Sequence, residues 1–314
     1  EILRCLVGSE MCIRDRDRAG DEGSPLSFTL SVLDIPGATV ETFHPKAVHL
    51  YGNTLYVAND APGHYSLEVF DVSSGNVRHV KSMVEWMNGD KKETFAGEPN
   101  GVTRSYGKIY VTNTGSRTDV FDAETYEFIT CIGTGTWGEG GYQTVHAFDV
   151  TASQGAVFIR DKRKLVVVLE QDVQPGSAAR VPIYSRSVNL QEAMGTYAVA
   201  ARNDGFLYVT AQNKNIIYLF DPADIRAGDT GFAPYLVTLG FEKSPQSIAF
   251  VGDRLFVTLR VDDKRSELWE ISPKNGKLLQ DFTDSMVYPE KIAGARHTLL
   301  VVDRATQTVK AIGL

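Results

Sequence analysis

The chain has 314 residues, of which 43% are hydrophobic and 23% are charged, and its formal net charge is -7 at pH 7. These values are typical of a globular protein, and the acidic balance argues against nonspecific binding to nucleic acid. No apolar run reaches the roughly 18 residues that a membrane-spanning helix needs, so we expect no membrane span.

The first 26 residues differ in character from the rest. Residues 1–16 include CLVGSEMCIRDR, which resembles translated read-through of a sequencing adapter of the kind found fused to reading frames from bacterial metagenomes. Residues 17–26 are polar and rich in glycine, which is typical of a linker. We therefore expect residues 1–26 to be an artefact and a linker without fixed structure, and residues 27–314 to form a single domain.

Beyond this segment, short strands are predicted in a recurring order. Ser27 to Ile35 alternates between apolar and polar residues and predicts a β-strand ahead of the first repeat. Six apolar triplets then follow, each bounded by turn residues, and each predicts a strand that is covered on both faces. The triplets are Leu55–Val57, Ile109–Val111, Val157–Ile159, Leu207–Val209, Leu255–Val257 and Leu299–Val301. Their spacing of about 44 to 54 residues is the period of a four-stranded propeller blade.

A second short motif, two hydrophobic residues followed by an acidic one, occurs after most triplets, beyond a polar turn. It predicts a third strand that ends in an acidic residue, and its copies are Val69–Asp71, Val120–Asp122, Leu219–Asp221 and Leu268–Glu270. The last repeat, from Lys291 to the end, has room for only three strands. The N-terminal strand would complete it and close the ring, which removes exposed sheet edges. The sequence thus predicts an all-β, six-bladed β-propeller of four-stranded blades.

The repeat that begins at Glu98 has the clearest form, GEPNGV followed by GKIYVTN and TDVFD. It resembles the NHL and YVTN types of propeller repeat, and the likeness extends from about Pro45 to Leu314. Propellers of this kind include ligand-binding and protein-binding modules, lactonases and lyases, so the function has to be argued from the site. The resemblance also implies a place outside the cytoplasm, either periplasmic, secreted or lipid-anchored.

In a propeller the innermost strand of each blade lines the central channel, so the loops that lead into these strands reach one mouth. Proline recurs in these leading loops and keeps them extended, and the residues on either side of it point the same way. The ring of polar residues predicted at the mouth is His44, Lys46, Glu98, Asn100, His146, Gln246, Tyr288 and Glu290. Ordinary solvated surface is the alternative interpretation, because polar groups at a wet opening need no function.

The turns between second and third strands should reach the same mouth. They supply Asn59, Asp60, His64, Tyr65, Asn113, Arg160, Asp161, Lys162, Arg163, Gln212, Asn213, Arg260, Asp263, Asp303 and Arg304. Solvated turns are again one interpretation. The other is an anionic ligand held by arginines, with Arg163 the leading candidate. Trp86, Trp137 and Tyr142 are predicted in loops near this mouth, either to stack on a sugar or to pack their own loops.

Two metal sites can be considered. His44, Glu98 and His146 occupy equivalent places in three successive blades, and these donors suit zinc or another divalent ion with one coordination position left open. Resemblance to gluconolactonase-like propellers would instead imply calcium held by a carboxylate, two asparagines and an aspartate. Asn100 matches one of these positions, whereas Lys46 and Phe148 stand where oxygen ligands are needed.

We therefore expect a monomeric module that binds a small molecule, saccharide or protein at the channel mouth, with an acidic saccharide or peptide favoured. The alternative is a metal-dependent hydrolase, lactonase or lyase that uses the same opening with calcium or zinc. The sequence leaves open whether the protein is an enzyme.

Overall fold

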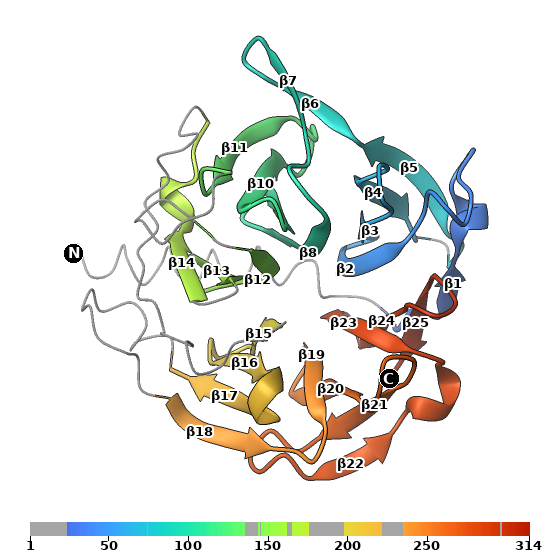
Figure 1. The fold of residues 1–314 in the computed structure, drawn as a ribbon, viewed down its shortest axis with the longest axis vertical. Helices are drawn as coiled ribbons and strands as arrows, with labels where there is room; N and C mark the ends of the chain where they lie inside the picture. Colours follow the sequence, from blue (N-terminus) through green and yellow to red (C-terminus); the bar gives the residue numbers. More distant parts are fainter. Residues whose placement is uncertain are drawn as a thin grey trace.

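The architecture is seen in a computed structural model, which describes residues 24–73, 75–135, 144, 146–161, 165–175, 198–221, 235–295 and 297–314. Antiparallel sheets follow one another around a ring of six blades, so the predicted all-β propeller is confirmed (Figure 1). The expectation for residues 1–26 stays a prediction, because residues 1–23 lie outside the described part. No helix in that part is long and apolar enough to cross a membrane.

The strands of each blade run outward from the channel in chain order, except that the outermost strand of blade 6 is the N-terminal β1. Blade 1 consists of β2 (Pro45–Tyr51), β3 (Thr54–Asn59), β4 (Ser66–Asp71) and β5 (Arg78–Met83). Blade 2 consists of β8 (Pro99–Ser105), β9 (Lys108–Asn113), β10 (Arg117–Asp122) and β11 (Phe128–Ile132). The described strands of blade 3 are β12 (Ala147–Ser153), β13 (Ala156–Asp161) and β14 (Leu165–Leu169). Blade 4 consists of β15 (Val199–Ala201), β16 (Leu207–Ala211), β17 (Ile216–Phe220) and β18 (Tyr235–Gly240). Blade 5 consists of β19 (Ser244–Val251), β20 (Arg254–Arg260), β21 (Ser266–Ile271) and β22 (Leu278–Asp281). Blade 6 consists of β23 (Pro289–Ala295), β24 (Thr298–Asp303), β25 (Thr308–Gly313) and β1 (Phe28–Leu30). Between blades 1 and 2 lies a hairpin of β6 (Glu85–Asn88) and β7 (Lys91–Thr94), and the described 3₁₀ turns are η1 (Val32–Asp34), η2 (Glu170–Asp172), η4 (Gln212–Lys214) and η5 (Thr283–Ser285).

The ring is closed as predicted, by the N-terminal strand. β1 pairs antiparallel with β25, with Leu30 opposite Val309. The strand is shorter than the predicted segment from Ser27 to Ile35, because Ser31 caps the turn η1. The Ser31 hydroxyl accepts a hydrogen bond from the backbone N–H of Leu33, and the Asp34 carboxylate accepts one from the N–H of Ser31.

The apolar triplets form the core because their two faces pack on different blades. In blade 1, Leu55 and Val57 pack in one cluster with Leu300 of blade 6. Tyr56, between them, packs in another cluster with Ile109 of blade 2. All three blade 1 side chains are fully buried. Each second strand is thus held between its two neighbouring blades, which explains why its sequence does not alternate.

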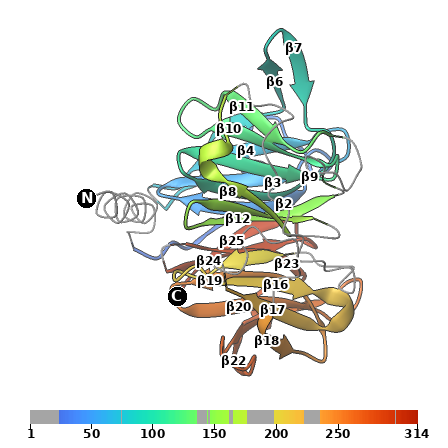
Figure 2. The same ribbon diagram turned by 90° about the vertical axis from the view of Figure 1, so that its left-hand side faces the viewer.

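The segment between blades 1 and 2 decides between the two roles predicted for Trp86. It forms the β6–β7 hairpin, which extends outward beyond the ring in both views (Figures 1 and 2). Trp86 is buried at its base, with its ring 4.9 Å from the rings of Phe95 and Phe121 and 5.7 Å from that of Phe128. Trp86 therefore packs its own loop and does not enter the channel mouth. Trp137, predicted beside it, lies outside the described residues, as does Tyr142.

The innermost strands of blades 2 and 3 approach each other closely at Gly101. A Cβ at this position would lie 2.7 Å from the Thr112 hydroxyl oxygen and 2.8 Å from the Asp149 Cα. We expect Gly101→Ala to lower the free energy of unfolding by about 1–3 kcal/mol, because a backbone atom must move. Gly240→Ala is the control, since no heavy atom lies within 4 Å of its Cβ position. Urea denaturation of both variants tests this, and equal losses would contradict it.

A partly buried histidine between blades 1 and 2 makes stability depend on pH. Burial, aided by the nearby charge of Arg104, lowers the pKa of His49 from 6.5 to about 4. Below pH 6.5 the unfolded chain therefore takes up a proton that the folded protein does not, so stability falls as the pH drops. One pKa unit is worth about 1.4 kcal/mol, so we expect a loss of about 3 kcal/mol by pH 4 that is absent in His49→Gln. Urea denaturation between pH 8 and 4 measures it, and parallel pH profiles of the two proteins would refute it.

Candidate functional site

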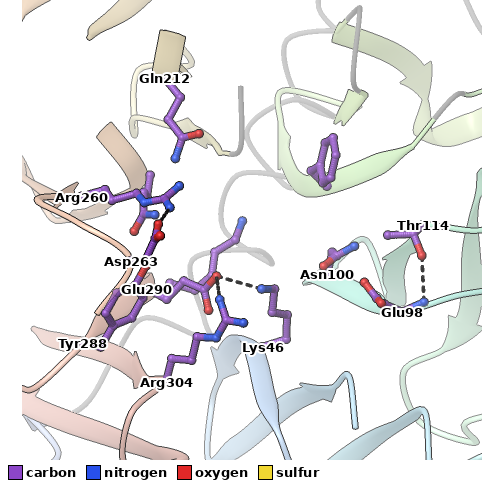
Figure 3. A pocket seen from close by; sticks show the side chains of 13 residues that line it. Lys46, Glu98, Asn100, Thr114, Gln212, Arg260, Asp263, Tyr288, Glu290 and Arg304 are labelled. Carbon is purple, nitrogen blue, oxygen red and sulfur yellow. Dashed lines mark hydrogen bonds and ion pairs between the residues drawn. The ribbon is translucent and has the colours of Figure 1, made fainter. Parts of the chain in front are cut away.

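A pocket of about 570 Å³ opens at the channel mouth, where the leading loops meet the turns that follow the second strands (Figure 3). Its lining consists of Lys46, Glu98, Asn100, Thr114, Phe148, Gln212, Gln246, Arg260, Asp263, Tyr288, Glu290, Lys291 and Arg304. All six blades contribute at least one side chain. Closure of the ring therefore brings together residues that are up to 258 positions apart in the sequence, from Lys46 to Arg304.

Most of the predicted ring lines this pocket. The members present are Lys46, Glu98, Asn100, Gln246, Tyr288 and Glu290, joined by Gln212, Arg260, Asp263 and Arg304 from the predicted turns. His44 and His146 are not among the lining residues. The His146 ring stacks on that of Phe148, 6.0 Å away, and it is Phe148 that reaches the pocket. Arg163 lies outside the described residues.

Ion pairs organise one side of the pocket. Lys46 Nζ donates a hydrogen bond to Glu290 Oε1 at 2.8 Å and lies 3.9 Å from Asp60 Oδ2. Arg304 Nη1 lies 3.5 Å from the same Glu290 oxygen. Burial acts to raise the pKa of Glu290, but Lys46 and Arg304 outweigh it and the pKa is lowered. Glu290 is therefore a carboxylate anion at neutral pH, shared between two blades.

The opposite side is mostly neutral. The backbone N–H of Glu98 donates to the Thr114 hydroxyl oxygen at 3.0 Å, which fixes the leading loop of blade 2 against its turn. Asn100, only 5% exposed, turns its side chain toward the pocket (Figure 3). Its Nδ2 amide has no hydrogen-bond partner among the described residues. A buried donor of this kind costs free energy unless a ligand or water accepts from it.

A second ion pair crosses the channel. Lys291 on β23 places its Nζ 3.3 Å from Asp149 Oδ2 on β12, and the two side chains are 9% and 16% exposed. The same Asp149 oxygen accepts a hydrogen bond from the backbone N–H of Val199 at 3.1 Å. Burial raises the pKa of Asp149 and lowers that of Lys291, so each charge depends on the other.

Several residues of the predicted turn group have structural contacts. Asn59 Oδ1 accepts from the N–H of His44 at 2.7 Å, and its Nδ2 donates to the Thr42 carbonyl, the His64 carbonyl and the Ser66 hydroxyl. In blade 6 the Asp303 carboxylate accepts from the N–H groups of Val287 and Tyr288. These residues fasten the leading loops to the turns and so position the ring residues.

The contacts of Asn59 can be tested by truncation. Asn59 is 2% exposed, and its removal would leave several partly buried backbone groups without this partner. We expect Asn59→Ala to lower the free energy of unfolding by about 2–4 kcal/mol, whereas the exposed Asn275→Ala should change it by less than about 1 kcal/mol. Thermal denaturation compares them, and an Asn59 effect as small as the control would contradict the structural role.

The metal hypotheses can be compared with this geometry. In the described part of the chain, no three His, Cys, Asp or Glu side chains form a group that could hold a metal ion. His44, Glu98 and His146 are all described, so the structure does not bring them together as a zinc site. The calcium pattern fits no better, because Lys46 in blade 1 is paired with Glu290 and Phe148 in blade 3 offers no oxygen ligand.

Comparison with known proteins finds structures that share the fold. No family model matches the chain, and no curated protein matches it. Among solved structures, the β-propeller domain of Cps50 (Swd1) from Myceliophteria thermophila has 12% sequence identity and a TM-score of 0.56, over 88% of this chain and 99% of that one. A catalytically inactive variant of virginiamycin B lyase from Staphylococcus aureus, solved with quinupristin, has 12% identity and a TM-score of 0.57, over 92% and 99%. At this identity the likeness shows a shared propeller fold.

Three lining residues were not assigned to the site from the sequence, namely Thr114, Phe148 and Lys291. Phe148 follows the leading loop of blade 3 as Asn100 follows that of blade 2, but an apolar side chain gave no reason to select it. Lys291 follows Glu290 directly and would point away from it in a regular strand. The register of β23 against β24 shifts between Pro289 and Lys291, which allows both neighbours to line the pocket.

Proposed function

We propose that this protein is a binding module for an acidic saccharide, which it takes up in the pocket at the channel mouth. The observation that carries the proposal is the gathering of four basic side chains on one pocket of an acidic protein: Lys46, Arg260, Lys291 and Arg304. They belong to blades 5, 6 and 1, which are neighbours in the ring. Carboxylate groups are well matched to arginine and lysine, which bind them by charge-assisted hydrogen bonds.

Two of these residues are accessible to a ligand. The side chains of Arg304 and Arg260 are 65% and 40% exposed. Arg304 pairs with Glu290, and Arg260 pairs with the largely exposed Asp263 and also donates to the Asp262 carbonyl. The Arg260–Asp263 pair is exposed on both sides, and exposed ion pairs contribute little free energy, so a ligand carboxylate can replace or share Asp263 at small cost. Glu290 keeps Lys46 as its closer partner, so Arg304 can also turn to a ligand.

The neutral half of the pocket favours a saccharide over an acidic peptide. Asn100 offers a buried amide donor without a partner among the described residues, and Thr114, Gln212 and Gln246 add groups that both donate and accept. Such groups match sugar hydroxyls, which also donate and accept. Phe148 supplies a flat apolar surface of the kind on which sugar rings stack.

The metal-dependent hydrolase, lactonase or lyase is the weaker alternative. One fold relative is a lyase, but at 12% identity the likeness extends to the fold alone. The described residues provide no cluster of three metal donors to support metal-assisted chemistry. The location outside the cytoplasm and the monomeric state remain predictions.

Calorimetric titration with a short oligogalacturonate tests the proposal. We expect binding that Arg304→Gln and Arg260→Gln each weaken by about tenfold or more, because a charge-assisted hydrogen bond contributes about 1.5–3 kcal/mol. Arg78→Gln is the matched control, since Arg78 is 72% exposed and pairs with Asp71 at the end of β4 and β5. Its affinity should equal that of the unchanged protein.

Two further titrations complete the test. A neutral oligogalactose of the same length should bind more weakly than the uronate by a similar factor, and a chelator should leave uronate binding unchanged. Equal affinity for the neutral sugar would overturn the proposed role of the basic residues. Loss of binding in chelator would favour the metal-dependent alternative.

A further inference from the structure

The most enclosed basic side chain of the pocket is Lys291. It is 9% exposed, against 19% for Lys46, and it still lines the cavity. Its Nζ lies 3.3 Å from Asp149 Oδ2, which reaches it from the opposite side of the channel. A buried amine at the wall of an accessible cavity, with a second cationic side chain such as Lys46 nearby, is an arrangement in which a lysine can act as a nucleophile.

The charges around Lys291 come from three strands. Asp149 faces it from β12, Lys46 from β2, and Glu290 precedes it on β23. Burial lowers the pKa of Lys291 and Lys46 acts in the same direction, whereas Asp149 and Glu290 oppose them, with a net lowering. Burial also raises the pKa of Asp149. The ammonium proton is therefore easier to pass to Asp149 than it would be for a lysine in water.

We infer that Lys291 captures a carbonyl-bearing ligand as an imine, with Asp149 carrying the proton. The inference rests on the proposed function, because the ligand must reach the same pocket. It also deepens that function, since the open-chain form of a uronate has an aldehyde at one end and a carboxylate at the other. The carboxylate would be bound by the arginines while the aldehyde carbon meets Lys291.

The step balances without any added reagent. Lys291 passes one ammonium proton to Asp149, and the free amine attacks the carbonyl carbon. A C–N bond forms, the π electrons of the carbonyl move to oxygen, and that oxygen takes a proton from the nitrogen. Asp149 then protonates the hydroxyl, which leaves as water while the C=N bond forms. The products are a protonated imine and one water, with Asp149 again a carboxylate.

Reductive trapping on the whole chain tests this inference. The protein is incubated at pH 7 with glyoxylate, which carries both an aldehyde and a carboxylate, and with cyanoborohydride, which reduces an imine to a stable amine. Digestion by a protease that does not cut at lysine, followed by mass spectrometry, locates the Nε-carboxymethyl groups. We expect labelling of Lys291 to exceed that of the exposed Lys274 severalfold, because a lowered pKa raises the fraction of Lys291 that is the neutral amine. Labelling at Lys291 no greater than at Lys274 would overturn the inference.

A variant tests how the neighbouring charges affect Lys291. Lys46→Met removes a neighbouring positive charge and leaves Glu290 without its closest partner, so the pH at which trapping reaches half its maximum should rise. Lys91→Met, on the exposed β7, is the control and should not shift it. An unchanged profile in Lys46→Met would count against the inference. Oligogalacturonate binding without trapping would refute the imine alone, and trapping without that binding would refute the proposed ligand alone.

Discussion

The structure depends on one constraint, which is that the second strand of every blade must be buried on both faces. Tyr56 packs toward blade 2 while its neighbours Leu55 and Val57 pack toward blade 6, and all three are fully buried. No single sheet can satisfy such a strand, so each blade needs another on either side. Closure into a ring meets this requirement for every blade, and β1 completes the last sheet. The channel and its polar mouth follow from this packing.

Closure also forces charged side chains into a narrow space. These charges form ion pairs that join different blades: Lys46 with Glu290, and Lys291 with Asp149 across the channel. A buried ion pair adds little net stability, but removal of one partner leaves an isolated charge that is costly. The channel residues are therefore bound to one another first. The more exposed Arg260 and Arg304 are the charges left in position to meet a ligand.

The sequence predicted the architecture well, because the architecture follows from short-range patterns. The repeat period and the two-sided triplets define the blades, and the leading loops of a closed ring must share one opening. Pairings across the ring could not be predicted in the same way. Lys291 and Asp149 are 142 positions apart, and their contact depends on how far each strand reaches into the channel. The sequence also left open whether Trp86 binds a ligand or packs its own loop, because its burial depends on Phe121 and Phe128, which belong to the next blade.

The pocket also shows how a repeat can produce an asymmetric site. The six blades share one backbone plan, yet blades 5, 6 and 1 give the lining four basic and two acidic side chains, whereas blades 2 to 4 give it a single acidic one, Glu98. The electric field across the mouth therefore has a direction that the backbone symmetry does not impose. A ligand with a carboxylate at one end and hydroxyls at the other can enter in one favoured orientation. That orientation would place the carboxylate end of the ligand beside Arg260 and Arg304, the two most exposed basic side chains of the lining.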